Sequence, residues 1–322
     1  MSPAHIKFRG TRLTPVERPI FFVGMPRSGT TLMFEAFAAH PDLAWFSQYF
    51  NRLSRFPSVS VLSRIADLHP KLRRRVERSD QSRRLSNRLR VGPSEAALAW
   101  ERYSGARFHT DFLLDAEASA DERDRLHATV SKILLYHGKP RFAAKVTGPA
   151  RIGYLTSVFP DARFVHIIRD ARAVVQSLMR APFWKDTWRL REPAWCGGLR
   201  DDELATWERL DRSPVALAAL EWRAVIRTAR QEASRLATGR YREVRYEDFL
   251  SDPHSVLGQL FSFCDLREAV AAHALLDREF ELRDMNRQWR DRVSGPEVDL
   301  FDELIGELLG ELGYERAPSH SP

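Results

Sequence analysis

The chain has 322 residues, of which 43% are hydrophobic and 29% charged, a composition that supports a large folded core and excludes a simple membrane protein. Its formal net charge is +7, and only six of its 50 basic side chains are lysine. A positive charge suits an anionic ligand, because a positive cleft concentrates anions. The excess of arginine over lysine also fits codon bias in a GC-rich genome.

The cysteines and the N-terminus bear on where the protein is found. Cys196 and Cys264 are too few for a disulfide framework and lack metal-ligand spacing, so we expect a reducing compartment. The first residues carry no apolar run behind their charges, and no stretch approaches the roughly 20 apolar residues that a spanning helix needs. The sequence therefore predicts a cytoplasmic protein with no membrane span and no metal site.

Short apolar runs alternate with helical patterns along the chain. Residues 1–18 have little periodicity and are predicted to be a tail. Residues 20–23 form a continuous apolar run, typical of a strand buried on both faces, and a helical pattern follows over residues 30–39. Similar runs, at 142–145 and 164–168, also precede helical sequence, and residues 244–246 close a fourth candidate strand before a further helix. This alternation predicts an α/β fold with a parallel sheet flanked by helices.

Two long stretches, about 51–138 and 183–238, hold helical patterns and no convincing strand. Within the second, residues 216–236 are amphipathic and are expected to pack on the sheet. Residues 301–312 predict a C-terminal helix. Because no internal repeat or low-complexity linker interrupts the chain, we predict a single domain over residues 19–322 with two helical insertions.

The strongest local signal is the loop from Gly24 to Thr31, between the first predicted strand and helix. Backbone N–H groups converge in such a turn, and the helix N-terminus adds a positive dipole end, which together make an anion site. The glycine spacing is P-loop-like, but Thr30 stands at the Walker lysine position and the strong cation, Arg27, lies inside the loop. A small-molecule kinase that uses Mg²⁺ is therefore the weaker hypothesis, and the loop fits a shorter anion bound without a metal.

Residues 26–33, followed by Ala-His-Pro-Asp at 39–42, resemble the sulfotransferase superfamily. The match is nearer to the bacterial, tyrosylprotein and heparan branches than to the cytosolic steroid and phenol branch. The resemblance implies 3'-phosphoadenosine-5'-phosphosulfate (PAPS) as the donor and sulfuryl transfer to a hydroxyl or amine as the reaction. It also implies a catalytic role for Arg27 and a phosphosulfate site made by Arg27, Ser28, Gly29, Thr30 and Thr31.

The resemblance continues through residues 159–177. A strand predicted to end at Ile168 places Arg169 at the carboxyl edge of the sheet, where open α/β folds bind ligands. Arginine grips phosphate oxygens in pairs, and the family residues that match Arg169 and Ser177 hold the 3'-phosphate. The alternative for Arg169 is a local ion pair with Asp170. Shorter matches imply donor contacts by Lys145, Tyr246, Trp289 and Arg290.

The general base is not fixed by the resemblance. The cytosolic branch has a histidine where this chain reads Lys-Val-Thr at 145–147, and Gln48 stands where the tyrosylprotein branch has its glutamate. The catalytic candidates are Glu95, ahead of an apolar helix, and His109. Each has a structural alternative, since a glutamate is favoured in the first turn of a helix and a hydrogen-bonded histidine is common.

Residues 71–90 carry nine basic side chains with few apolar anchors. They predict a solvated helical face, a surface for a polyanionic or acidic-peptide acceptor, or a lid, and no fold signature for nucleic-acid binding accompanies them. We expect the insertions to bind a small-molecule, glycan or peptide acceptor. The sequence names neither that acceptor nor the oligomeric state. A non-catalytic protein that binds nucleotides or polyanions is the remaining alternative to an enzyme.

Overall fold

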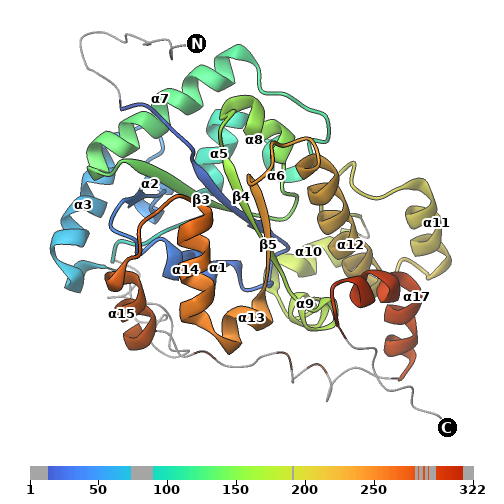
Figure 1. The fold of residues 1–322 in the computed structure, drawn as a ribbon. Coiled ribbons are helices and arrows are strands. Elements are labelled where there is room, and N and C mark those ends of the chain that lie inside the picture. The colour runs from blue at the N-terminus through green and yellow to red at the C-terminus, as the bar shows by residue number, and fades with distance from the viewer. Residues whose placement is uncertain are drawn as a thin grey trace.

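The computed structural model describes residues 14–73, 90–190, 192–279, 282, 286, 289 and 295–314. Its centre is a five-stranded sheet in the order β2-β3-β1-β4-β5, and all four strand pairs are parallel (Figure 1). The predicted α/β fold with a parallel sheet is confirmed. The strands are β1 (Ile20–Gly24), β2 (Leu43–Ala44), β3 (Arg141–Thr147), β4 (Arg163–Ile168) and β5 (Tyr241–Arg245).

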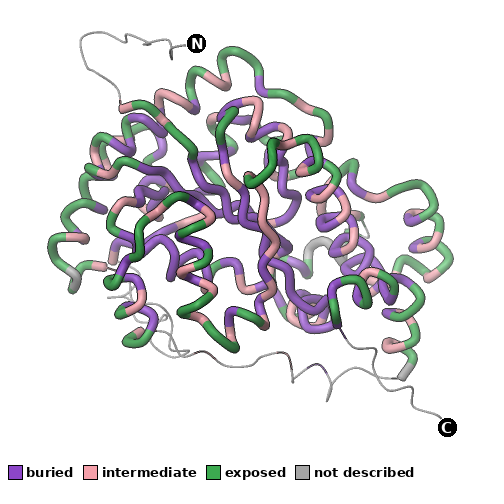
Figure 2. The backbone as a smooth tube through the Cα atoms, viewed as in Figure 1, coloured by how far each residue is buried: buried purple, intermediate pink, exposed green. Residues whose placement is uncertain are grey.

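The central strand β1 is buried on both faces, which explains its continuous apolar run. Phe21 and Val23 pack on one side of the sheet, with α5 (Ala97–Ser104), α7 (Ala120–His137) and α8 (Ile152–Val158). Ile20 and Phe22 pack on the other side, with α1 (Thr30–Phe37), α14 (Pro253–Phe263) and α15 (Val270–Glu279). Figure 2 shows this core as a continuous buried centre.

A third apolar cluster includes Ile168, the last residue of β4. There α12 (Pro214–Ala233), the predicted amphipathic helix, packs against α9 (Ala171–Leu178) and the C-terminal α17 (Gly295–Glu311). Trp222 of α12 is completely buried, and its Nε1 donates to the carbonyl of Arg169 at 3.1 Å. The cluster therefore supports the backbone at the carboxyl end of β4.

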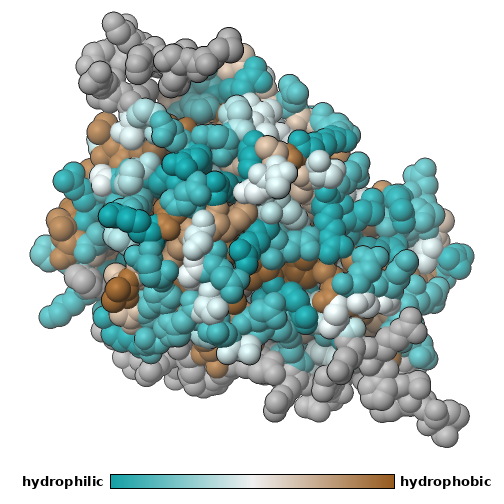
Figure 3. Space-filling view, viewed as in Figure 1, coloured by the Kyte–Doolittle hydropathy of each residue, from teal (hydrophilic) through white to brown (hydrophobic). Residues whose placement is uncertain are grey.

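The stretches predicted as helical insertions contain no named strand in their described parts. Residues 51–138 contain the end of α2 (Gln48–Arg52), η1 (Pro57–Ser60), α3 (Val61–Leu68), η2 (Pro70–Leu72), α5, α6 (Arg107–Thr110) and α7. Residues 183–238 contain most of α10 (Pro182–Leu190), α11 (Asp201–Arg209) and α12. The face drawn in Figure 3 is mostly hydrophilic, although α3 exposes several apolar side chains, Val61, Leu62, Ile65 and Leu68.

The two edge strands differ from the sequence prediction. β2 was not predicted, because a two-residue strand gives no periodic signal. β5 begins at Tyr241 rather than 244, and its first three residues are only partly buried, so polar side chains are tolerated there. Tyr246 does not extend this strand but begins α13 (Tyr246–Ser251).

Several sequence features fall partly or wholly outside the described residues. Of the nine basic residues at 71–90, only Lys71, Arg73 and Arg90 are described. Arg73 lies 3.8 Å from Asp67 and donates to the carbonyl of Ala38. Its side chain is therefore bonded to other residues of the same chain. Both cysteines are free thiols. In the described part of the chain, no helix has the length and apolar character needed to cross a membrane.

Candidate active site

Four parallel strands end at the same edge of the sheet, and each is followed by residues with polar or aromatic chemistry. The glycine loop, residues 24–31, follows β1, and Arg169 follows β4. Thr147 ends β3, and Tyr246 follows β5. The carboxyl edge of an open α/β sheet is where such folds bind their ligands. The candidate active site is therefore assembled at this edge.

The glycine loop keeps hydrogen-bond donors available at the N-terminus of α1. Gly29, with φ at 83°, caps this helix and has no side chain to occupy the first N–H groups. The Ser28 hydroxyl is buried and has no hydrogen-bond partner among the described residues. Because a buried polar group without a partner is costly, Ser28 and the helix N-terminus together fit an anionic ligand.

Arg27 adopts a left-handed backbone conformation, with φ at 72°. Residues other than glycine rarely adopt this conformation, and such strain clusters at functional sites. The exposed Arg27 side chain donates from Nε to the Ser177 hydroxyl at 2.9 Å, and its carbonyl accepts from Arg169 Nη1 at 2.9 Å. The structure thus brings together Arg27, Ser177 and Arg169, which lie far apart in the sequence.

Arg169 is buried, with its guanidinium carbon 4.5 Å from the centre of the Tyr246 ring. Its Nε donates to Asn286 Oδ1 at 2.8 Å, and burial lowers the pKa of this arginine. The alternative of a local ion pair with an N-cap is correct for the cap, since Asp170 caps α9, but Asp170 pairs with Arg172 at 2.8 Å instead of with Arg169. Arg169 therefore keeps its charge at the ligand-binding edge.

Two described residues that follow α15, Asn286 and Trp289, also contact this edge. Asn286 donates from Nδ2 to Glu247 Oε1 at 2.5 Å, so it links Arg169 to the helix that follows β5. The ring of Trp289 is buried and lies 4.1 Å from the guanidinium carbon of Arg172. Arg290 lies outside the described residues. Asn286 was missed as a site residue from the sequence, although it belongs to the segment that predicted Trp289.

Gly29 lies directly beneath the Tyr246 ring. A Cβ atom added at Gly29 would lie 2.2 Å from a ring carbon of Tyr246, whereas one added at Gly239, with a similar φ of 81°, would meet nothing within 4 Å. Both alanine variants have left-handed strain on the order of 1–3 kcal/mol. Gly29→Ala should therefore lower the melting temperature more than Gly239→Ala and should also weaken nucleotide binding. Calorimetry of both variants checks this, and equal effects would contradict the packing described.

Lys145 reaches the loop from the neighbouring strand. Its Nζ donates to the Thr31 hydroxyl at 2.6 Å and lies 3.7 Å from Glu95 Oε2. The other oxygen of Glu95 accepts hydrogen bonds from the backbone N–H of Thr147, at 3.1 Å, and from the Thr147 hydroxyl. Lys145 thus places a cation beside the loop, where the Walker lysine is missing.

Glu95 precedes α5 and does not belong to its first turn. Ala96, with φ at 55°, caps this helix, and Glu95 points instead to the end of β3. The alternative that Glu95 stabilises a first helical turn is therefore wrong.

Gln48 holds the segment that carries Glu95. Its side chain accepts from the N–H of Gly92 at 3.0 Å and donates to the carbonyl of Arg90, and Ser94 N–H donates to Phe46 at 2.7 Å. Gln48, at the position of the glutamate in the tyrosylprotein branch, thus makes structural hydrogen bonds in this chain.

Both catalytic candidates line one small cavity of about 100 Å³. His109 lies there with a ring nitrogen, Nε2, 2.6 Å from the carbonyl oxygen of Ala97. Trp100 and Phe108 stack in its wall, with ring centres 4.6 Å apart. The full lining is Glu95, Ala97, Trp100, Phe108, His109, Lys145, Val146, Thr147 and Arg151. The cavity therefore combines a carboxylate, an imidazole and a cation beside the glycine loop.

The two helical insertions meet next to this cavity. Residues 110–112 pair with Cys196 through two backbone hydrogen bonds of 2.7 and 2.9 Å. Trp195 covers Gly148, where an added Cβ would lie 2.7 Å from the indole. The buried carboxyl of Glu221 accepts from Ala194 N–H at 2.6 Å, and burial raises its pKa to about 8. At neutral pH the Glu221 carboxyl is therefore largely protonated. Its hydrogen bond with Ala194 N–H holds the segment whose next residue, Trp195, covers Gly148.

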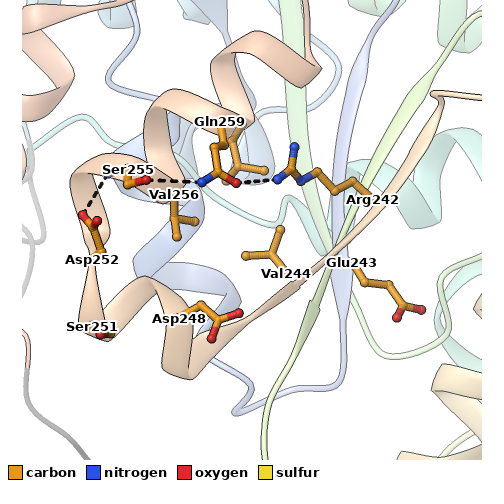
Figure 4. A pocket seen from close by; sticks show the side chains of 10 residues that line it. Arg242, Glu243, Val244, Asp248, Ser251, Asp252, Ser255, Val256 and Gln259 are labelled. Atoms are coloured by element: carbon orange, nitrogen blue, oxygen red, sulfur yellow. Dashed lines mark hydrogen bonds between the residues drawn. The ribbon is translucent and has the colours of Figure 1, made fainter. Parts of the chain in front are cut away.

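A larger hollow of about 350 Å³ lies between β5 and α14 (Figure 4). Arg242 donates to Gln259 at 2.5 Å, Gln259 to Ser255 at 3.2 Å, and Ser255 N–H to Asp252 at 3.1 Å. These polar groups satisfy one another, and none of the loop residues line the hollow. Within the described residues, no group of three or more His, Cys, Asp or Glu side chains is arranged to hold a metal ion.

The fold and this edge define a class of α/β protein with a P-loop-like strand, loop and helix that lacks the Walker lysine. The profile of the Sulfotransferase family matches residues 19–269, and the chain belongs to that family.

Individual relatives agree with this assignment. The protein-tyrosine sulfotransferase of Drosophila melanogaster is 24% identical over 94% of this chain and 50% of its own length. The omega-hydroxy-beta-dihydromenaquinone-9 sulfotransferase Stf3 of Mycobacterium bovis is 28% identical over 53% of this chain and 40% of its own. The chain thus spans half or less of these two relatives. The crystal structure of sulfotransferase STF9 from Mycobacterium avium shares the fold, with a TM-score of 0.57, 18% identity and coverage of 94% of this chain and 78% of that one.

Proposed function

We propose that this sulfotransferase takes the sulfuryl group from PAPS and transfers it to a hydroxyl or amine of an acceptor bound in the Glu95–His109 cavity. The observation that carries the proposal is the cluster of Arg27, Ser177 and Arg169, with contacts of 2.9 Å. Arg27 donates to the Ser177 hydroxyl, and Arg169 donates to the carbonyl of Arg27, so two guanidinium groups lie at one edge of the sheet. Such a pair is suited to an anion with phosphates at both ends, because arginine binds phosphate oxygens in pairs.

The loop residues fit the 5'-phosphosulfate of this donor. The Ser28 hydroxyl, which has no partner in the described part of the chain, would supply donors together with the N-terminus of α1 and the hydroxyls of Thr30 and Thr31. Arg169 and Ser177 would bind the 3'-phosphate, with Asn286 fixing the arginine. Tyr246 and Trp289 would pack against the nucleoside, and Arg290 would lie near the 3'-phosphate.

The residues on either side of the cavity account for the chemistry. Glu95 would accept the proton of the acceptor as the acceptor oxygen or nitrogen bonds to sulfur and the bond from sulfur to the phosphate oxygen breaks. Arg27 and Lys145 would stabilise the negative charge that grows on that departing oxygen. Glu95 is preferred over His109 as the base because it lies 3.7 Å from Lys145, the cation of the transfer site. His109 would then contact the acceptor from the rim.

The acceptor would reach the cavity beside the contact between the two insertions, where Thr110 and Phe112 pair with Cys196. Small molecules, glycans and peptides remain the acceptor classes expected from the sequence. A cytoplasmic location, a single domain and a reaction without a metal likewise remain predictions.

Thermal unfolding with different nucleotides tests the donor. Adenosine 3',5'-bisphosphate (PAP) at about 100 times its dissociation constant should stabilise the protein by roughly 2.7 kcal/mol. ATP with Mg²⁺ should have little effect, because the Walker lysine is replaced by Thr30. Stabilisation by ATP–Mg²⁺ and not by PAP would contradict the proposal and favour the kinase alternative.

A further inference from the structure

Arg151 is a buried cation in the acceptor cavity that neither the resemblance nor the proposed mechanism uses. It is 1% exposed, and it precedes α8 with φ at 51° and ψ at 38°. A residue other than glycine rarely adopts this left-handed conformation, and such strain persists where the surroundings hold it. Arg27 shows the same feature on the donor side, with φ at 72°.

Within the described residues, no anionic group accepts a hydrogen bond from Arg151. Nε donates to the carbonyl of Asp111 at 3.2 Å, and Nη1 donates to the carbonyl of Pro149 at 2.8 Å. The guanidinium carbon lies 4.9 Å from the centre of the Phe108 ring. These partners are all neutral. Among the described residues, Nη2 of Arg151 has no hydrogen-bond partner. Arg151 lines the cavity, so this group is placed to bind a ligand there.

The two carboxylates that attract the charge of Arg151 are those of Asp111 and Glu232, and both accept hydrogen bonds from other groups. Asp111 Oδ2 accepts from Arg107 at 2.8 Å. The oxygens of Glu232 accept from the N–H groups of Ile152 and Gly153, at 3.0 and 3.1 Å. Burial lowers the pKa of Arg151 to about 9, despite the attraction of both carboxylates, so the side chain is still a cation at neutral pH. A buried charge without a partner is destabilising, and an anion in the cavity would offset that cost.

We propose that Arg151 binds a carboxylate of the acceptor, so that the substrates of this enzyme are hydroxy or amino compounds that carry a carboxylate. This inference rests on the proposed function and specifies its acceptor. The cavity places Arg151 beside the stacked rings of Trp100 and Phe108, which favour an apolar spacer. Lys145 is already paired with Thr31 and Glu95 at the donor side, which leaves Arg151 as the cation for the acceptor. The Nη2 group of Arg151 would donate to the carboxylate, and a hydrogen bond between two charged groups is stronger than one between neutral groups.

A pair of probes that differ in charge but hardly in size tests this inference. 4-Hydroxyphenylacetate and 4-hydroxyphenylacetamide are titrated into the wild-type protein with and without PAP, by calorimetry near pH 7. The acid should bind at least roughly tenfold more tightly than the amide, because hydrogen bonds between charged groups are about twice as strong as neutral ones. Arg151→Met should remove this difference and leave PAP affinity unchanged. Arg125→Met, at an exposed arginine of α7, is the matched control and should preserve the difference.

Three results would overturn the inference: equal binding of acid and amide to the wild-type protein, no binding of either, or loss of PAP affinity in Arg151→Met. The last would assign Arg151 to the donor. The wild-type comparison stays decisive if Arg151→Met does not fold, since it needs no variant. Failure of PAP to bind the wild-type protein would contradict the proposed function, and the titrations without PAP would still judge the role of Arg151.

Discussion

Replacing Arg27 with alanine should lower the rate of sulfuryl transfer by roughly a hundred- to a thousandfold, the usual effect of removing one group that stabilises developing charge. Its Nε donates to the Ser177 hydroxyl at 2.9 Å and so joins the glycine loop to α9. The variant would lose this contact and the cation proposed to stabilise the transition state. The side chain is exposed, and the alanine variant should unfold at a melting temperature close to that of the wild type. Steady-state transfer from PAPS and differential scanning calorimetry measure the two effects.

Arg212 provides a matched control for Arg27. It is also exposed and left-handed, with φ at 51°, but it lies in the turn between α11 and α12 and pairs with Glu208 at 3.1 Å. Arg212→Ala should therefore transfer sulfate at the wild-type rate. Full activity in Arg27→Ala, or an equal loss in both variants, would show that the role of Arg27 is misassigned.

Replacing Glu95 with glutamine should lower kcat by roughly a hundred- to ten-thousandfold, the range expected for loss of a general base. Glutamine keeps the shape of the side chain and an oxygen that can accept from Thr147 N–H, but it cannot take a proton from the acceptor. Affinity for PAP should therefore change little while kcat falls. Rapid-quench measurement of transfer, combined with PAP titration, separates these two quantities.

Glu101→Gln on α5 is the control for Glu95, since Glu101 is exposed on the helix that follows the same segment. It should leave kcat unchanged. A Glu95→Gln variant with wild-type kcat would assign Glu95 to structure alone, through its contacts with Thr147 and Lys145. The same result combined with loss of activity in His109→Gln would move the proton-accepting role to His109, the other catalytic candidate in the cavity.

The fold was predictable where burial on both faces leaves a continuous apolar run. β1, β3 and β4 each show such a run, and the helix after each strand shows its own periodicity. The edge strands were harder to predict for physical reasons. β2 has only two residues, and β5 begins with Tyr-Arg-Glu, which an edge strand tolerates because one of its sides has no neighbouring strand.

The juxtaposition of the residues proposed for the donor site was predictable, because these residues follow strand ends directly. Arg27 lies just after β1 and Arg169 just after β4, and parallel strands must bring such positions to one edge. The acceptor side depends on contacts between distant segments. Nothing in the sequence connects Gln48 with Gly92, or Arg151 with the carbonyl of Asp111, so neither the placement of Glu95 nor the burial of Arg151 could be derived from residue patterns.

The most direct measurement of the central claim is transfer of radiolabelled sulfate from PAPS. Wild-type protein and Arg27→Ala are incubated with labelled PAPS and a mixed extract of small molecules, glycans and peptides, and labelled products are separated by chromatography. The account predicts that label moves to one or more acceptors with the wild-type protein and far more slowly with Arg27→Ala. Label that remains on PAPS, although PAP stabilises the protein, would contradict the account and identify a nucleotide-binding protein without transferase activity.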